Sequence, residues 1–109
     1  MGQLIYGPGT VYEMDDRTLA HVKLALTTKL RRQESFLLSW PISAGHGSGR
    51  TSLWINPTIP LQFQFSGSRP PTINRTWVMM MLESAHSDRG LTILSEAGAE
   101  KSTHGGTTP

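Results

Sequence analysis

The stretch that decides the fold is 15-DDRTLAHVKLALTTKLRRQE-34, which predicts one amphipathic helix over residues 15–34. Two acidic residues open it, where a carboxylate accepts free amide N–H groups and suits the positive end of the helix dipole. Lys29, Arg31 and Arg32 close it, where cations suit the carbonyl end. The apolar residues follow at spacings of three or four, which places them on one stripe: Leu19, Val22, Leu26 and Leu30.

Outward from this helix, the remaining patterns predict strands and one further helix. Turn residues and period-two alternation predict strands at residues 3–6, 10–14, 36–42, 51–56, 61–66 and 91–94. The second helix is predicted over 73–87, with Thr72 or Asn74 as its cap. From Ala97 onward the chain is small and polar, which favours a disordered tail.

The element order is therefore β-β-α-β-β-β-α-β, with short turns that favour antiparallel pairing. We expect a small two-layer α+β fold with a mostly antiparallel sheet, two helices and a disordered C-terminal tail. Residues 1–96 would form a single α+β domain and residues 97–109 the polar tail. With only two helices, one face of the sheet should be partly exposed.

Composition excludes several classes of function. The chain has no cysteine, so disulfides and thiolate metal sites are absent. No apolar run approaches the ~20 residues that span a bilayer, and the start MGQLIYG lacks a signal-peptide pattern, so a cytoplasmic location is expected. The histidines His21, His46, His86 and His104 form no i, i+4 pair. They are interpreted as surface residues, and neither a metal nor another cofactor is expected.

The net charge of +2 is distributed unevenly. Between residues 17 and 50 the only acid is Glu34, and the local net charge is +5, from Arg17, Lys23, Lys29, Arg31, Arg32 and Arg50. On a helix that turns about 100° per residue, Arg17, His21, Arg31 and Arg32 fall opposite the leucine stripe. Such a face could lie along DNA phosphates without reading sequence. A merely solvated helix face is the alternative and the commoner occurrence.

A second candidate surface is the methionine-rich stretch 77-WVMMML-82 in the second predicted helix. Methionine-rich faces adapt to partners and recur at interaction surfaces. A helix that is apolar on nearly all sides has little protein to cover it in so small a chain, which favours self-association. The residues predicted to bind a partner are Trp77, Met79, Met80 and Leu82. Packing of this helix in the core is the alternative.

The glycine-rich segment 44-AGHGSGRT-51 is a third candidate, because it resembles a phosphate-binding loop. That loop needs a leading glycine, a lysine before the Ser/Thr, and a helix whose amides meet the phosphates. Here Ala44 and Arg50 replace the glycine and the lysine, and a strand is expected to follow. The segment is therefore interpreted as a hairpin connection.

Several motifs together resemble a family of small uncharacterised proteins of high-GC Gram-positive bacteria, whose members are often labelled ATP-dependent DNA ligase. The resemblance covers about residues 1–95. It is carried by G-x-L-I-Y-G, D-D-R-T-L-A-H-x-K with T-T-K-L-R-R, S-F-x-L-S-W, G-S-G-R-T-S-L-W-I, I-P-L-Q-F-x-F with S-R-P-P, and I-N-R-x-W. The label implies nucleotidyl transfer on DNA.

The chemistry of ligation argues against that activity in this chain. Nucleotidyl transfer needs a lysine nucleophile in a K-x-D-G setting and acidic metal ligands on a scaffold that encloses ATP. The lysines Lys23, Lys29 and Lys101 are followed by LAL, LRR and STH, so none has this setting. The sequence therefore predicts a protein that is not an enzyme.

Two hypotheses of different classes follow. The first is a DNA-binding accessory module that uses basic residues, and it is preferred. Its predicted contacts are Arg17, His21, Arg31, Arg32, Arg50 and Arg69. The second is a module that homodimerises or binds a protein partner through the second helix. Binding to DNA that weakens with salt would separate the first from the second.

Overall fold

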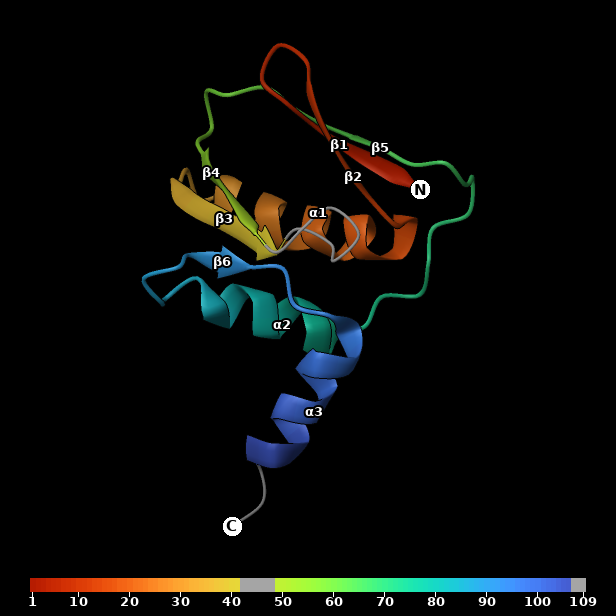
Figure 1. The fold of residues 1–109 in the computed structure, drawn as a ribbon, viewed down its shortest axis with the longest axis vertical. Helices are drawn as coiled ribbons and strands as arrows, with labels where there is room; N and C mark the ends of the chain where they lie inside the picture. The colour runs from red at the N-terminus through yellow and green to blue at the C-terminus, as the bar shows by residue number, and fades with distance from the viewer. Residues whose placement is uncertain (42–48, 107–109) are drawn as a thin grey trace.

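The computed structural model describes residues 1–41 and 49–106, and of residues 102–106 only the backbone. Its architecture is α+β, as the sequence predicted. Helix α1 crosses the middle of the molecule, with a sheet on one side and α2 on the other (Figure 1). The elements are β1 (Gly2–Tyr6), β2 (Thr10–Met14), α1 (Asp16–Leu30), β3 (Phe36–Pro41), β4 (Arg50–Ile55), β5 (Leu61–Gln64), α2 (Arg75–Ser84), β6 (Leu91–Thr92) and α3 (Glu96–Gly106).

Helix α1 begins as the sequence predicted and ends earlier. Asp15 is its N-cap, and its carboxylate accepts the Thr18 N–H at 3.1 Å and the Thr18 hydroxyl at 2.7 Å. The helix ends at Leu30 because Gln33 adopts a left-handed φ of 61°. The amides that follow Arg32 then bond back to Leu30 and Lys29, as in a Schellman ending. Arg31 and Arg32 therefore lie at the terminus of α1 and not within it.

The described strands form two three-stranded sheets, where the sequence predicted one layer. The first has the order β2-β1-β5 and is antiparallel throughout. The second has the order β4-β3-β6, in which β3 and β4 are antiparallel and β6 is parallel to β3. Strand β5 thus leaves its chain neighbour β4 and pairs with the N-terminal hairpin. Mostly antiparallel pairing is confirmed.

Strand bounds differ from the predictions by a few residues at the ends. The predicted strand 36–42 is observed over Phe36–Pro41; its last residue, Ile42, lies outside the described residues. The strand predicted at 91–94 is only two residues long, Leu91 and Thr92. Of the glycine-rich segment only the last residues are described, and Arg50 pairs with Pro41 across the β3–β4 hairpin. A strand therefore follows this segment, as predicted, and not the helix that a phosphate loop requires.

Helix α2 is shorter than the predicted 73–87, because it spans Arg75–Ser84. Asn74 is its N-cap, and its side-chain oxygen accepts the Trp77 N–H at 3.3 Å. Of the two caps that the sequence allowed, Asn74 is therefore the one used. Gly90 follows with a φ of +77°, and a Cβ there would stand 2.5 Å from the Leu37 carbonyl oxygen. This position admits only glycine without rearrangement.

The predicted disordered tail is instead helical through residue 106. Helix α3 (Glu96–Gly106) packs against α2, and its Ala99 is fully buried. The small residues that suggested disorder allow close approach of this helix to α2, which composition alone does not reveal. The described fold therefore has three helices where the sequence predicted two.

A single hydrophobic cluster joins both sheets and all three helices. The leucine stripe of α1 enters it, with Leu19, Val22 and Leu26 fully buried and Leu30 packed at its edge. Burial of each such side chain stabilises the fold by roughly 1.5–3 kcal/mol before entropy is counted. The other members come from every layer: Leu4, Ala25, Phe36, Leu38, Leu53, Ile55, Trp77, Met81, Leu91 and Ala99.

Candidate nucleic-acid interface

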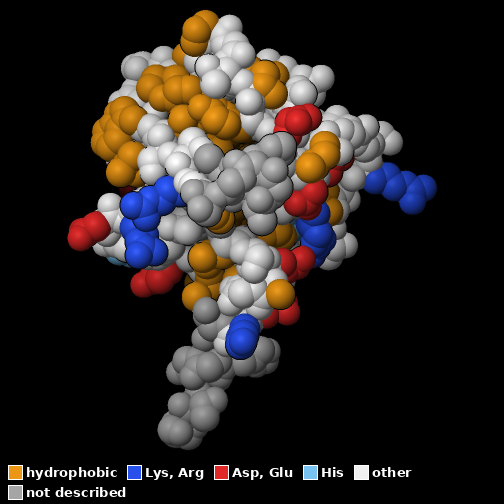
Figure 2. Space-filling view, viewed as in Figure 1, with side chains coloured by type: hydrophobic (Ala, Val, Ile, Leu, Met, Phe, Trp, Pro, Cys, Tyr) orange, Lys and Arg blue, Asp and Glu red, His pale blue; other side chains and the backbone are white. Residues whose placement is uncertain are grey.

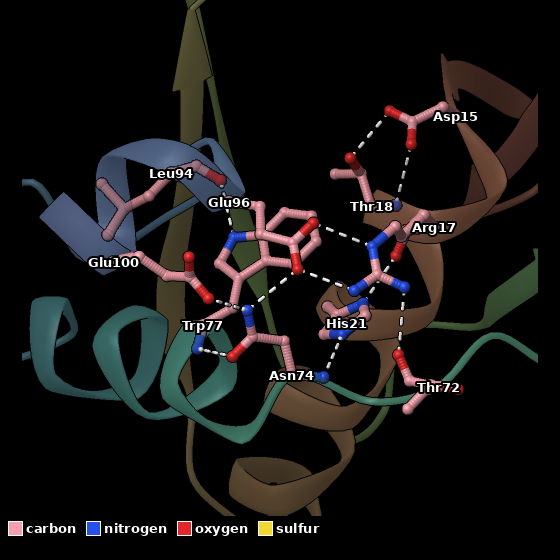
Figure 3. A network of polar contacts seen from close by, with 10 residues as sticks. All are labelled: Asp15, Arg17, Thr18, His21, Thr72, Asn74, Trp77, Leu94, Glu96 and Glu100. Carbon is pink, nitrogen blue, oxygen red and sulfur yellow. Dashed lines mark hydrogen bonds and ion pairs between the residues drawn. The ribbon is translucent and has the colours of Figure 1, made fainter.

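A network of polar contacts joins the first half of α1 to α2 and α3 (Figure 3). We call it the polar junction and define it by five residues, Arg17, His21, Asn74, Trp77 and Glu96. They come from three separate parts of the chain. Two of them were predicted as DNA contacts and one as a partner contact, so their surroundings decide how much of the predicted surface exists.

Arg17 is held in a bidentate ion pair, which the sequence did not predict. Its Nε donates to Glu96 Oε1 at 2.8 Å and its Nη2 to Glu96 Oε2 at 2.7 Å, while Nη1 donates to the Thr72 carbonyl at 3.0 Å. The hydrogen bond to Glu96 raises the pKa of Arg17. In turn, the guanidinium of Arg17 and the amide of Asn74 lower the pKa of Glu96 to about 2. Planar fork-to-fork pairs of this kind are among the stronger ion pairs.

His21 is fully buried, so its assignment as a surface residue on a basic outer face is wrong. Its Nδ1 lies 2.7 Å from the Arg17 carbonyl, and its Nε2 accepts the Asn74 N–H at 2.8 Å. A backbone N–H can only donate, so the proton of the neutral ring sits on Nδ1. The ring also stacks on Trp77, with centroids 4.4 Å apart and planes at 28°. Both ring nitrogens are occupied within the protein.

Asn74 and Trp77 complete the junction from the start of α2. The Asn74 amide donates to Glu96 Oε2 and to Glu100 Oε1, both at 2.9 Å. The indole N–H of Trp77 donates to the Leu94 carbonyl at 2.8 Å, and the side chain is only 2 % exposed. Trp77 therefore offers almost no surface to a partner. Arg17, His21 and Trp77 hold the three helices together; His21 and Trp77 are buried, and Arg17 keeps part of its side chain exposed beside Glu96.

The cations that stay free lie on a different side of α1. Lys23 and Arg31 are exposed, eight residues apart. In helical geometry they lie about 12 Å apart along the axis and about 80° apart around it. His21 lies about 200° from Lys23 around the same axis, which faces it toward the junction. Arg32 follows Arg31 at the end of α1, and Arg69 lines the same pocket as Lys23. We call the four residues Lys23, Arg31, Arg32 and Arg69 the cationic flank.

Neighbouring groups leave this flank positive. Arg31, Arg32 and Arg69 are exposed and make no ion pair among the described residues. Arg69 lies beside Lys23, since both line one pocket. The acid in that pocket, Asp16, forms no ion pair with a described residue; its carboxylate accepts the backbone N–H groups of residues 66 and 67 at 3.1 and 2.8 Å. These bonds lower the pKa of Asp16.

Arg50 does not join the flank. It pairs with Pro41, whereas the other end of β4 pairs with Phe36, just after the α1 terminus that carries Arg31 and Arg32. On the face drawn in Figure 2, the Lys and Arg side chains lie in separate groups with acidic side chains among them. Of the six residues predicted to contact DNA, Arg31, Arg32, Arg50 and Arg69 are exposed, Arg17 is paired with Glu96, and His21 is buried.

The methionine-rich helix keeps one clearly exposed apolar side chain. Met79 is 67 % exposed, whereas Met80 and Leu82 are partly buried against the core. Arg75 and Glu83 lie on the same face of α2 as Met79, and both are charged and exposed. The predicted partner-binding face is therefore reduced from a broad apolar surface to a narrow stripe.

Lys23 is the residue of the cationic flank that the sequence-based prediction did not include. Its position relative to the leucine stripe showed only that it borders the apolar side. Its exposure depends on what packs against α1, which the sequence pattern does not report. Within the described part of the chain no group of three or more His, Asp or Glu side chains could hold a metal ion. Across the same residues, no helix has the length and hydropathy that a membrane crossing requires.

The fold and its surfaces define a small α+β protein with a part-buried polar junction between its helices and a cationic flank. Residues 1–96 match the family of the domain of unknown function DUF7882, and the chain belongs to this family. No curated protein and no solved structure matches the chain. The family match ends at the first residue of α3, the same Glu96 that pairs with Arg17.

Proposed function

We propose that this protein is a non-catalytic module that binds nucleic acid through its cationic flank. The observation that supports the proposal is the exposure of Lys23 and Arg31 on one side of α1, continued by Arg32 and Arg69, with the neighbouring carboxylate of Asp16 already satisfied. A row of cations about 12 Å long suits the phosphates of a few nucleotides. Contacts to phosphates carry no sequence information, so the proposed binding is nonspecific.

The electrostatics set the expected strength of this binding. Each phosphate contact contributes a salt dependence of about 0.7 to 0.9 in the slope of log affinity against log salt concentration. Four cations therefore predict a slope near 3, and weak binding at physiological salt. Such a module would add affinity to a larger assembly on DNA or RNA, which fits an accessory role.

The test is a titration of fluorescently labelled DNA, followed by anisotropy at several salt concentrations. The variant Lys23→Glu/Arg31→Glu reverses two charges of the flank and should abolish measurable binding. The matched control, Lys101→Glu/Arg50→Glu, changes the same two residue types at exposed positions away from the flank. It should keep most of the affinity. Equal loss in both variants, or no binding by the wild type at low salt, would refute the proposal.

We also propose, as a second role, weak homodimerisation through the outer face of α2. Arg75, Met79 and Glu83 are exposed and follow one another at spacings of four, so they form a single stripe. This stripe is self-complementary: when two copies pack antiparallel about a two-fold axis, Met79 meets Met79 and each Arg75 meets the partner's Glu83. An isologous contact of this kind closes after two subunits.

A charge swap tests this dimer. Glu83→Arg places like charges opposite each other and should lower the association constant about tenfold, as measured by sedimentation at several concentrations. Arg75→Glu/Glu83→Arg restores opposite charges across the axis and should recover dimerisation. A protein that stays monomeric up to millimolar concentration, or a double variant as weak as the single one, would refute this role.

A further inference from the structure

A cavity opens beside the cationic flank, between α1 and the segment that joins β5 to α2. Its volume is about 330 Å³. That is near the lower limit of the ~300–1,000 Å³ found for small-molecule sites, so it suits a group no larger than one heterocycle with its sugar. Its walls are largely apolar and are formed by Ala20, Leu24, Phe65, Pro70, Pro71 and Ile73.

The charged groups at this cavity are mainly cationic. Lys23 lines it with its ammonium 5.7 Å from the centroid of the Phe65 ring, and Arg69 lines it from the loop. Asp16 also lines it, but both its carboxylate oxygens accept backbone N–H groups. The cavity therefore offers an apolar interior with an aromatic wall, two cations and one carboxylate held by backbone amides. The complementary ligand has a flat apolar part and a negative charge beside it.

We infer that this cavity receives one unstacked base of a single-stranded nucleic acid while Lys23 and Arg69 contact the adjoining phosphates. The inference rests on the proposed function, because the same flank supplies the cations. Sequence-independent binding of single strands combines these two features, a cationic path for the backbone and aromatic or apolar platforms for bases. A base inside a duplex is stacked on both faces and cannot enter such a cavity. Single strands are therefore the preferred ligand.

The protein side of this site accepts the base without rearrangement of the fold. Phe65 is half-buried. The backbone that follows it is held by hydrogen bonds that the N–H groups of residues 66 and 67 donate to the Asp16 carboxylate. Pro70 and Pro71 restrict the backbone of the opposite wall. Rigid walls lower the conformational entropy lost on binding. The Lys23 ammonium lies over the Phe65 ring, and because the side chain is exposed it can turn toward a phosphate and leave the ring face to the base.

The experiment compares three labelled probes of equal length: a 12-nucleotide thymine strand, a strand of 12 abasic sites with the same phosphates, and the corresponding duplex. Stacking of one base predicts that the thymine strand binds at least about fivefold more tightly than the abasic strand. The duplex should bind no more tightly than the abasic strand. Ser68→Phe, which fills the cavity from an exposed position, should reduce the thymine strand to the abasic level.

The control variant is Gln62→Phe, which adds the same side chain at an exposed position of β5 that does not line the cavity. It should leave the preference for thymine intact. Equal affinity for thymine and abasic strands overturns the inference and leaves the proposed function standing. Absence of salt-dependent binding to all three probes overturns both. Tighter binding of an acidic peptide that contains phenylalanine would also overturn the inference, because the cavity would then serve a protein segment.

Discussion

The polar junction and the cationic flank use the same helix in opposite ways. At the junction, Arg17 forms an ion pair with Glu96, and its backbone carbonyl accepts a hydrogen bond from His21, so these side chains of α1 stabilise the fold. On the flank, Lys23 and Arg31 make no ion pair with a described residue. The role of a basic residue on this helix therefore depends on what packs beside it.

The two regions also differ in how far their partners lie along the chain. Arg17 and Glu96 are separated by 79 residues, and His21 and Asn74 by 53. The flank, in contrast, is formed mostly by residues of one short segment and needs only that nothing covers it. Changes at the junction should therefore alter stability first, and changes on the flank should alter binding first.

The largest effect is expected for Trp77→Ala at the junction. This substitution removes a buried indole, its stacking on His21 and its bond to Leu94, and should lower the free energy of unfolding by about 3–5 kcal/mol. That is a large part of the roughly 5–15 kcal/mol typical of native proteins. Urea unfolding followed by circular dichroism measures it. Trp54→Ala, at a tryptophan that is 53 % exposed, is the control and should cost about 1 kcal/mol or less.

The next effect concerns the charge of Glu96 and its pH dependence. The pKa of Glu96 is held at about 2, below the ordinary 4.5, by Arg17 and Asn74. A lowered pKa in the folded state contributes stability that is complete above the unfolded value and is lost as the pH falls from about 4.5 toward 2. We expect Glu96→Gln to lower the melting temperature at pH 7 and to melt with a shallower dependence on pH in that window.

Glu13→Gln is the matched control for Glu96→Gln, because the Glu13 carboxylate is exposed and makes no ion pair with a described residue. Its melting temperature at pH 7 should stay near that of the wild type. Asp16 and Glu34 also have lowered pKa values, from the backbone amides of Gly67 and Ser66 and from the hydrogen bond with Lys29. Glu96→Gln should therefore keep some acid sensitivity. If the melting temperature of Glu96→Gln depended on pH as that of the wild type does, the ion pair would not stabilise the junction.

A third prediction separates the two regions by salt dependence. Lys23→Gln/Arg31→Gln removes two phosphate contacts and should lower the slope of log affinity against log salt by about 1.5, with stability nearly unchanged. Arg17→Lys keeps the charge and loses the bidentate geometry, so it should lower the melting temperature and leave the slope unchanged. If Arg17→Lys also lowered the slope, the junction would take part in binding.

The smallest effect is expected for Arg50→Gln. Arg50 is exposed at the end of β4 away from the flank. The free energy of unfolding should therefore change by no more than about 0.5 kcal/mol. The slope of log affinity against log salt should stay within the error of the measurement. Chemical unfolding and the anisotropy titration measure the two quantities. A clear loss of affinity would extend the flank to sheet β4-β3-β6.

Much of the local structure could be predicted from the sequence. The spacing of Leu19, Val22 and Leu26 indicated the buried side of α1, and the observed caps were among the candidates: Asp15 was one of two opening acidic residues, and Asn74 one of two possible caps. These features depend on residues a few positions apart, so the pattern contains them. Helix ends were less predictable, because Gln33 in a left-handed conformation carries no clear sequence signal.

Features that depend on distant segments could not be predicted. The choice of β1 over β4 as the partner of β5 depends on how the chain returns across α1. The helical C-terminal segment was missed because its small residues indicate disorder until a packing surface, here α2, is present. The candidate site was predicted in part: Arg31, Arg32 and Arg69 belong to the flank, whereas Lys23 was overlooked.

Local patterns were enough to predict that α1 is a capped helix with one apolar stripe, that hairpin-forming strands flank it, and that basic residues lie on its other sides. Packing between distant segments then set which of those basic sides stayed open. The physical reason is that periodic patterns report contacts within a few residues, whereas the cover over Arg17 and His21 comes from Asn74, Trp77 and Glu96, more than 50 residues away.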